Sequence, residues 1–152
     1  MSKSHAKVTV DHQFKSTDPE QVFDAWLDPT LIGQWMFGPR LREEEVLRIS
    51  VDPRVEGSFS FLVLRDGQKL NHIGKYLEIN RPHRLVFTWG IRQDPPASSE
   101  VSIDIVTWRA GSKLTLTHKL HPHWAAYAKR TEAGWTTMLG VLDEVLSSTS
   151  SD

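Results

Sequence analysis

The chain has 152 residues, of which 39% are apolar and 24% are charged, and its net charge is -1. This composition is typical of a globular domain, so it excludes a disordered chain and a collagen-like chain. It also argues against two kinds of partner. There is no basic surplus to hold nucleic acid, and the longest apolar run, residues 124–128, is far shorter than the roughly 20 residues that insertion into a membrane requires.

The two ends of the chain and the absence of cysteine bear on the cellular compartment that we expect for the protein. Residues 1–5 lack the apolar segment of a secretory signal peptide. Without cysteine there can be no disulfide, no thiol nucleophile and no cysteine metal site, and such a chain is compatible with a reducing compartment. We therefore expect a cytoplasmic protein with one domain over residues 1–152, in which the polar ends 1–5 and 147–152 are frayed.

The first elements expected along the chain are a strand and two short helices. Residues 7–14 alternate between polar and apolar side chains, which predicts a half-buried strand. Asp18-Pro19 and Asp28-Pro29 each combine a good N-cap residue with a proline at the first helical position. Each pair therefore predicts the start of a short helix, and the second helix should extend to Met36.

Six further strands follow as a meander. Period-two alternation predicts them near residues 47–51, 59–63, 73–79, 85–91, 101–105 and 114–120. In the first of them, the alternating apolar residues are Leu47, Ile49 and Val51. Asp66-Gly67 is a strong signal for a tight hairpin between the second and the third.

The last element is a long helix predicted over residues 122–146, because its apolar side chains recur at spacings of three and four. A helix of about 25 residues is about 37 Å long, and a ten-residue strand reaches about 34 Å. An antiparallel sheet must bury one face, and only this helix is long enough to cover it. The sequence therefore predicts an α+β fold, in which a curved antiparallel sheet of about seven strands wraps around the C-terminal helix and two short helices follow the first strand.

A curved sheet and a straight helix touch closely at some points and leave space at others, so we expect an internal cavity between them. The longest loop, residues 92–99, is a candidate gate to it. The alternative is that the inward side chains fill the space, since protein interiors pack densely. The candidate ligand-binding residues are mostly apolar or aromatic: Trp35, Met36, Phe59, Phe61, Tyr76, Phe87, Trp89, His118, Trp135 and Met138.

Motifs for catalysis and metal binding are mostly missing from the sequence. His118, His121 and His123 lie close together, but strand alternation and Pro122 keep them from converging, and no carboxylate completes a ligand set. We expect no metal and no cofactor. His118 is the best single candidate for a general base, and a core histidine is the alternative. We therefore expect a binding protein rather than an enzyme.

The acidic run Glu43–Glu45 lies between the second short helix and the next strand. We interpret it as a solvated edge, because short charge runs usually face water. A docking patch for a protein partner is the alternative.

Five stretches of the sequence, taken in order, resemble a known family. They are Val22-Phe23-Asp24-Ala25-Trp26, Trp35 through Pro39, Asp52-x-Arg54-x-x-Gly57-x-Phe59, Arg84-Leu85-Val86-Phe87-Thr88-Trp89, and Gly134-Trp135 followed by Leu139 and Leu142. Together they are similar to the START and Bet v 1-like (SRPBCC) superfamily, and within it to the subgroup related to the activator of Hsp90 ATPase. The resemblance implies the helix-grip fold. Glu56 departs from the pattern, because many relatives have a second glycine there.

The resemblance and the expected cavity together favour one function and leave two alternatives. The favoured function is binding of a small apolar or aromatic ligand between the last helix and the concave sheet. One alternative is an Hsp90-type chaperone-regulating interaction module. The other is a cofactor-free cyclase or hydrolase acting on an aromatic or polyketide-like substrate. The expected partners are thus a small apolar ligand or a chaperone, with no nucleic acid and no membrane insertion, and a homodimer is compatible with the sequence.

Overall fold

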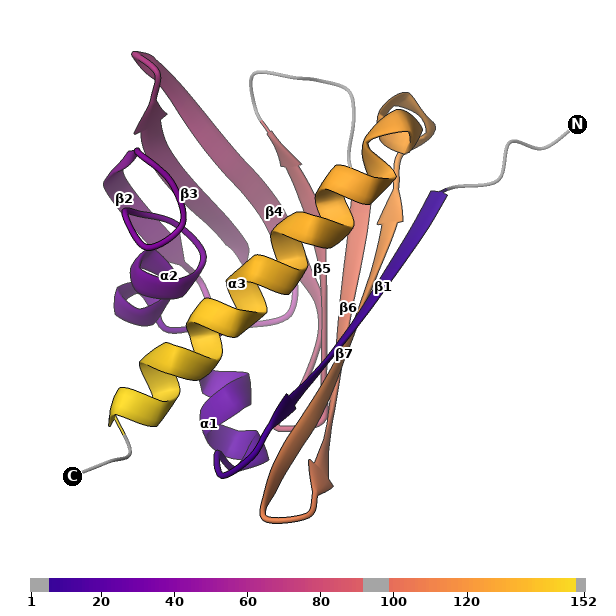
Figure 1. Ribbon diagram of the computed structural model, residues 1–152. Coiled ribbons are helices and arrows are strands. Elements are labelled where there is room, and N and C mark those ends of the chain that lie inside the picture. Colours follow the sequence, from indigo (N-terminus) through magenta and orange to yellow (C-terminus); the bar gives the residue numbers. More distant parts are fainter. Residues whose placement is uncertain (1–5, 92–98, 150–152) are drawn as a thin grey trace, which may run out of the picture.

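The computed structural model describes residues 6–91 and 99–149 (Figure 1). Its seven strands form one antiparallel sheet in the order β1-β7-β6-β5-β4-β3-β2. Their bounds are β1 Ala6–Phe14, β2 Glu45–Val51, β3 Ser58–Arg65, β4 Gln68–Asn80, β5 Arg84–Ile91, β6 Ser99–Trp108 and β7 Gly111–Leu120. The predicted α+β helix-grip fold is therefore confirmed. The expected frayed residues 1–5 and 150–152, and residues 92–98 of the candidate gate 92–99, lie outside the described residues, whereas Ser99 begins β6.

The two short helices begin where the Asp-Pro pairs predict. In α1, Pro19–Asp24, the Asp18 carboxylate accepts a hydrogen bond from the Gln21 backbone N–H at 2.9 Å. In α2, Pro29–Trp35, the Asp28 carboxylate accepts one from the Thr30 N–H at 2.9 Å. Each cap satisfies a backbone donor that the first turn of a helix leaves unpaired, and this fixes where the helix begins.

The long C-terminal helix differs from the prediction at both ends. It opens with a 3-10 helix, η1 Pro122–Tyr127, and continues as the α-helix α3, Ala128–Thr149. The bond from the Trp124 N–H to the His121 carbonyl, 2.8 Å long, spans three residues, as 3-10 turns at helix ends do. At the other end, α3 passes Leu146 and includes residues 147–149, part of the segment expected to be frayed.

α3 runs diagonally across the concave face of the sheet, and α1 and α2 lie beside its C-terminal half (Figure 1). It buries one face in the core, through Trp135, Leu139, Val141, Leu142, Val145 and Leu146. A hydrogen bond of 2.8 Å between His12 Nε2 and the Asp143 carboxylate ties it to β1. The helix is therefore held against the sheet by apolar burial and by a polar contact to the edge strand.

A β-bulge changes the expected phase of β2. The pairing of β2 with β3 shifts register between Val46 and Arg48, so Leu47 drops out of the alternation. Leu47 is 37% exposed, and Val46 packs against the core in its place. The simple alternation of Leu47, Ile49 and Val51 is therefore wrong at Leu47, because a bulge adds one residue that a period-two pattern does not show.

Glu56, where many relatives have a second glycine, adopts a backbone conformation that favours glycine. Its φ angle is 73°, in the left-handed region that glycine occupies without strain. The turn is held by hydrogen bonds on both sides, from the Glu56 N–H to the Tyr76 carbonyl and from the Tyr76 N–H to the Gly57 carbonyl, both 2.9 Å. The chain therefore adopts at Glu56 a backbone conformation that a second glycine would adopt more easily.

Candidate functional site

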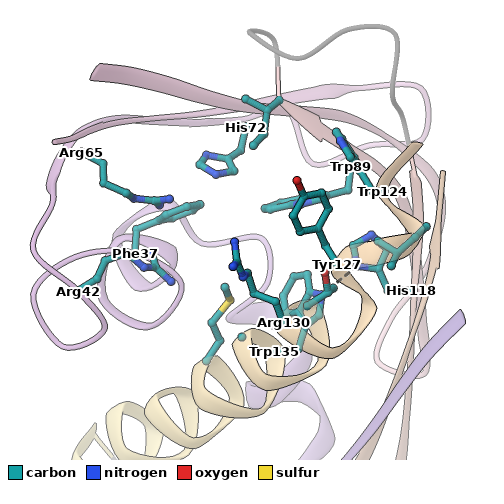
Figure 2. A pocket seen from close by; sticks show the side chains of 15 residues that line it. Phe37, Arg42, Arg65, His72, Trp89, His118, Trp124, Tyr127, Arg130 and Trp135 are labelled. Atoms are coloured by element: carbon teal, nitrogen blue, oxygen red, sulfur yellow. Dashed lines mark hydrogen bonds between the residues drawn. The ribbon is translucent and has the colours of Figure 1, made fainter. Parts of the chain in front are cut away.

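A cavity of about 520 Å³ lies between the N-terminal half of α3 and the sheet (Figure 2). Five aromatic side chains form much of its wall: Phe37, Trp89, Trp124, Tyr127 and Trp135. Five further lining side chains carry nitrogen: Arg42, Arg65, His72, His118 and Arg130. The cavity is therefore largely apolar, and its polar groups are nearly all cationic groups or imidazoles.

The position of the cavity follows from where the short helices pack. Next to the cavity, Trp26 and Trp35 lie edge to face with ring centroids 4.6 Å apart, and the ring of Trp26 lies 5.8 Å from that of Trp135. The Trp35 indole N–H donates to the Ala25 carbonyl at 3.0 Å, so this buried ring has its hydrogen-bond partner. Both rings belong to the buried core together with Leu139 and Leu142 of α3, whereas the space beneath the N-terminal half of α3 stays open.

The ten candidate ligand-binding residues divide between the cavity wall and the closed core. Trp89, His118, Trp135 and Met138 line the cavity. The other six are buried in the closed core and do not line it: Trp35, Met36, Phe59, Phe61, Tyr76 and Phe87. Strand phase identifies the face of the sheet that a side chain takes, but it does not say which part of that face α1 and α2 cover.

Several lining residues were not singled out from the sequence: Phe37, Arg42, Arg65, His72, Trp124 and Arg130. One of them had a usable signal. The Asp66-Gly67 turn has positive φ at both residues, as a two-residue hairpin requires, and it pairs Phe61 with His72. Counting back from that turn would have placed His72 on the same face as Phe61.

His118 lies in a chain of hydrogen bonds whose direction can be assigned. The Trp135 indole N–H, which can only donate, points at His118 Nδ1 at 3.0 Å, so Nδ1 accepts. Burial lowers the pKa of His118 to about 4, so the neutral ring carries its proton on Nε2. Nε2 then donates to the Ser99 hydroxyl at 2.6 Å, and that hydroxyl donates to the Trp89 carbonyl at 2.9 Å.

This direction is the reverse of that in a nucleophile–base pair. A general base would accept the serine proton on an unprotonated nitrogen. Here the nitrogen that faces Ser99 is protonated, and the serine proton is directed at a backbone carbonyl. The arrangement fixes the orientation of the Trp135 ring in the cavity wall, and it leaves His118 without a free ring nitrogen.

His72 is a second neutral imidazole in the wall. Its Nδ1 lies 3.2 Å from the Phe61 carbonyl and must donate to it, so Nε2 is left as an acceptor. Burial lowers the pKa of His72 to about 4, the hydrogen bond to Phe61 opposes the shift, and the charge of Arg65 adds to it. The ring lies 4.8 Å from that of Phe37 and 5.5 Å from that of Trp89, centroid to centroid. His72 thus belongs to the aromatic wall.

A buried carboxylate holds two of the arginines in place. Glu44 Oε1 accepts from Arg65 Nε and Nη2, at 2.9 and 2.7 Å. Its Oε2 accepts from Arg42 Nη1 and the Gly38 N–H, both at 2.8 Å. Burial alone would raise the pKa of Glu44, but these hydrogen bonds and the nearby positive charges outweigh it, so the pKa lies below its ordinary value. The carboxylate is therefore ionised at neutral pH.

The interpretation of Glu43–Glu45 as a solvated edge is wrong at Glu44, because the Glu44 side chain is 0% exposed. Its neighbours Glu43 and Glu45 are exposed. The chain turns Glu44 inward because two arginines and a backbone N–H together can satisfy a carboxylate away from water. Among the residues that the structure describes, no three His, Cys, Asp or Glu side chains converge as they would around a metal ion.

Comparison with known proteins places this geometry in a family. Residues 16–147 match the family described as Activator of Hsp90 ATPase homolog 1-like protein. No curated protein matches the chain. Within residues 6–91 and 99–149, no helix is long and apolar enough to cross a membrane.

Solved structures share the fold over nearly the whole chain. The protein CV1439 from Chromobacterium violaceum is 25% identical, with a TM-score of 0.79, over 91% of this chain and 95% of that one. An AHSA1-like protein from Aeromonas hydrophila is 18% identical, with a TM-score of 0.74, over 94% and 93%. DynU16, named as a protein of the dynemicin biosynthetic locus, is 18% identical, with a TM-score of 0.73, over 93% of this chain and 47% of that one.

Proposed function

The chain belongs to the family of Activator of Hsp90 ATPase homolog 1-like proteins, and from this premise we propose that it binds a small apolar or aromatic molecule in the cavity between α3 and the concave sheet. One observation carries the proposal. The core is closed beneath the C-terminal half of α3, yet about 520 Å³ stays open beneath the N-terminal half. That volume lies in the range of roughly 300–1,000 Å³ that is usual for small-molecule sites.

The walls suit an apolar or aromatic occupant because their rings are held in place before binding. Trp135 is fixed by its bond to His118, and the Trp89 ring lies 5.7 Å from that of Trp135. Burying apolar ligand surface against such walls contributes about 25 cal/mol per Å². Rings already fixed in position lose little freedom when a ligand enters, so more of that contribution appears as affinity.

The hydrogen bonds around His118 argue against its acting as the general base of a cofactor-free cyclase or hydrolase. A base in the cavity must have an unprotonated nitrogen within reach of the substrate. Both nitrogens of His118 are engaged, Nδ1 by Trp135 and Nε2 by Ser99. This leaves His72, whose Nε2 is unprotonated, as the remaining imidazole in the wall that could act as a base. We expect ligands to leave the cavity chemically unchanged, and mass spectrometry of an aromatic ligand after prolonged incubation checks this, with His72→Gln as the control for any turnover.

The alternative of an Hsp90-type regulating module rests on the family description. Large apolar side chains exposed in the described part of the chain lie on separate elements: Leu47, Val55, Leu77, Val106 and Tyr127. Scattered exposure of this kind is ordinary, whereas a docking face is usually a continuous patch. We expect purified Hsp90 to show neither binding nor a change in ATPase rate, and stimulation of the ATPase would instead favour the module.

Two glycines on α3 offer a matched pair of variants to test the binding site. A Cβ atom built on Gly134 or on Gly140 meets nothing within 4 Å, so either position accepts a larger side chain. Only Gly134 lines the cavity. Gly134→Leu should fill the cavity and weaken ligand binding, whereas Gly140→Leu should leave binding unchanged. Both should gain about 1 kcal/mol of helix stability, so a change in folding does not explain the difference.

The measurement is quenching of tryptophan fluorescence and thermal shift with fatty acids, sterols and polyaromatic compounds. A ligand that binds only the folded state must raise the melting temperature. We expect at least one class to bind the unmodified protein and the Gly140→Leu variant, and to bind Gly134→Leu at least tenfold more weakly. Absence of binding across the panel, or equal binding to both variants, would contradict the proposal.

A further inference from the structure

Charge is unevenly distributed in the cavity. Three arginines line it, Arg42, Arg65 and Arg130, and none of the described side chains on its wall is a carboxylate. The lining histidines are neutral, so they do not add to the charge. Glu44 lies behind the wall and balances one of the three guanidinium charges, so two positive charges are left in surplus among residues 6–91 and 99–149.

The arginines retain hydrogen-bond donors for an occupant. A guanidinium group has five N–H bonds. Arg65 directs Nε and Nη2 at Glu44, and Arg42 directs Nη1 at it, while both side chains remain 29% exposed. Because Glu44 fixes their positions, the free donors of Arg42 and Arg65 are ordered before a ligand arrives.

Arg130 approaches from the opposite wall. Its side chain extends from α3 toward the interior of the cavity (Figure 2), with the guanidinium carbon 5.6 Å from the centre of the Tyr127 ring. In the described part of the chain it pairs with no carboxylate, whereas Arg42 and Arg65 both pair with Glu44. The three cations thus come from α3, from β3 and from the segment after α2, around one apolar space.

We propose that the natural occupant is an amphipathic carboxylate, whose charged group is held by Arg130 together with Arg42 and Arg65 and whose apolar body lies against the aromatic wall. This inference rests on the proposed function and narrows it to one class of ligand. A carboxylate fits because its two oxygens match the planar fork of a guanidinium group. The apolar remainder of the wall, formed by side chains such as Trp89, Trp135 and Met138, matches a hydrocarbon or aromatic body and offers little to a sugar or a nucleotide.

The pKa of His72 offers a second readout for a bound anion, in addition to the affinity. Its imidazole projects into the cavity from β4 (Figure 2), near Arg65. A bound anion would favour the protonated ring, so binding should raise the pKa of His72. A neutral ligand of the same shape should not. NMR titration of the His72 ring with and without ligand therefore distinguishes a bound carboxylate from apolar binding elsewhere.

The experiment uses two matched pairs of probes, octanoate with octanamide and naphthoate with naphthamide. Calorimetric titration of the whole chain should give an affinity on the order of tenfold higher for each acid than for its amide. High salt should narrow this gap, because ions screen charges that are open to solvent. Octyl phosphate is the fifth probe, and tighter binding of it than of octanoate would overturn the assignment of a carboxylate.

Three variants locate the effect. Arg130→Gln should remove most of the gap between acid and amide, while Lys129→Gln, an exposed neighbour on α3 with the same change in charge, should leave it. Glu44→Gln should widen the gap, because removing the negative charge behind the wall strengthens its attraction for an anion by more than the looser positions of Arg42 and Arg65 weaken it. Circular dichroism confirms that each variant folds.

The possible results distinguish failure of the carboxylate assignment from failure of the proposed ligand binding itself. Binding of neither acid nor amide would overturn both. Equal affinity for acid and amide would leave the binding cavity standing and overturn the carboxylate assignment. Equal losses in Arg130→Gln and Lys129→Gln would show a general effect of net charge rather than a site, and would also overturn it.

Discussion

The two halves of α3 cover the same sheet in different ways. Beneath the C-terminal half, Leu139 and Leu142 are 0% exposed and pack in a core that the rings of Trp26 and Trp35 help to fill. Beneath the N-terminal half, Trp135 and Met138 border open space. Both halves carry apolar side chains at helical spacing. The helix pattern therefore sets which face is buried, and the elements packed beside it set whether the space is filled.

The largest expected difference between the halves is in their response to acid. His72 and His118 both line the cavity, and each has a pKa of about 4 in the folded protein, compared with an ordinary value of 6.5. Between these values the unfolded chain binds protons at the two positions and the folded chain does not, so acid favours unfolding. Stability should be fully present above about pH 6.5 and should fall by roughly 3 kcal/mol per histidine on acidification to about pH 4.

Urea denaturation across this pH range measures the loss. The His72→Gln and His118→Gln variants should each remove about half of this acid-dependent loss in the free energy of unfolding. The double variant should remove nearly all of it, because glutamine does not titrate. A double variant with the same pH dependence as the unmodified protein would place the acid sensitivity elsewhere in the molecule.

Neighbouring residues on α3 sharpen the comparison further. Leu139 lies in the closed half and Met138 lines the cavity. Leu139→Ala should lower the free energy of unfolding by about 2–5 kcal/mol, because it opens a hole in a filled core. Met138→Ala should lower it by less than about half as much, because part of that side chain already faces open space. Equal losses by chemical denaturation would mean that the two halves are packed alike.

Sequence patterns predicted the architecture well, because local rules control it. Strand alternation and the Asp18-Pro19 and Asp28-Pro29 pairs depend on neighbours in the chain, so the strands and the short helices could be located. The bulge at Leu47 could not be located, since an extra residue is set by pairing with β3 rather than by local composition.

The site was less predictable, because it depends on packing between distant elements. Trp35 and Trp135 are both buried tryptophans on helices, yet only Trp135 reaches the cavity. Arg130 and Lys129 are adjacent basic residues on α3, and only the position of the sheet beneath them shows that Arg130 lines the space. Glu44 belongs to an acidic run, and its burial depends on Arg65, twenty-one residues further along the chain.

A smaller change in stability is expected at Tyr76, which lies in the closed core. This side chain is 2% exposed, and within the described residues its hydroxyl has no hydrogen-bond partner. A buried hydroxyl without a partner is unfavourable by roughly 1–3 kcal/mol, so Tyr76→Phe should raise the free energy of unfolding by about 1 kcal/mol. Thermal denaturation measures the gain. A loss of stability would mean that the hydroxyl is satisfied in solution, for example by a buried water molecule.

The smallest expected effect on the free energy of unfolding concerns the turn at Glu56, which does not line the cavity. A residue with a side chain is disfavoured in the left-handed region by roughly 1–2 kcal/mol, and glycine is not. Glycine in turn loses more chain entropy on folding, by roughly 0.5–1 kcal/mol. Since φ at Glu56 is 73°, Glu56→Gly should raise the free energy of unfolding by about 0.5 kcal/mol, and affinity for cavity ligands should not change. Glu56→Ala, which keeps the Cβ atom, serves as the control. A gain as large in that variant would attribute the effect to removal of the charge, whereas a gain confined to glycine would show that the strain lies in the backbone.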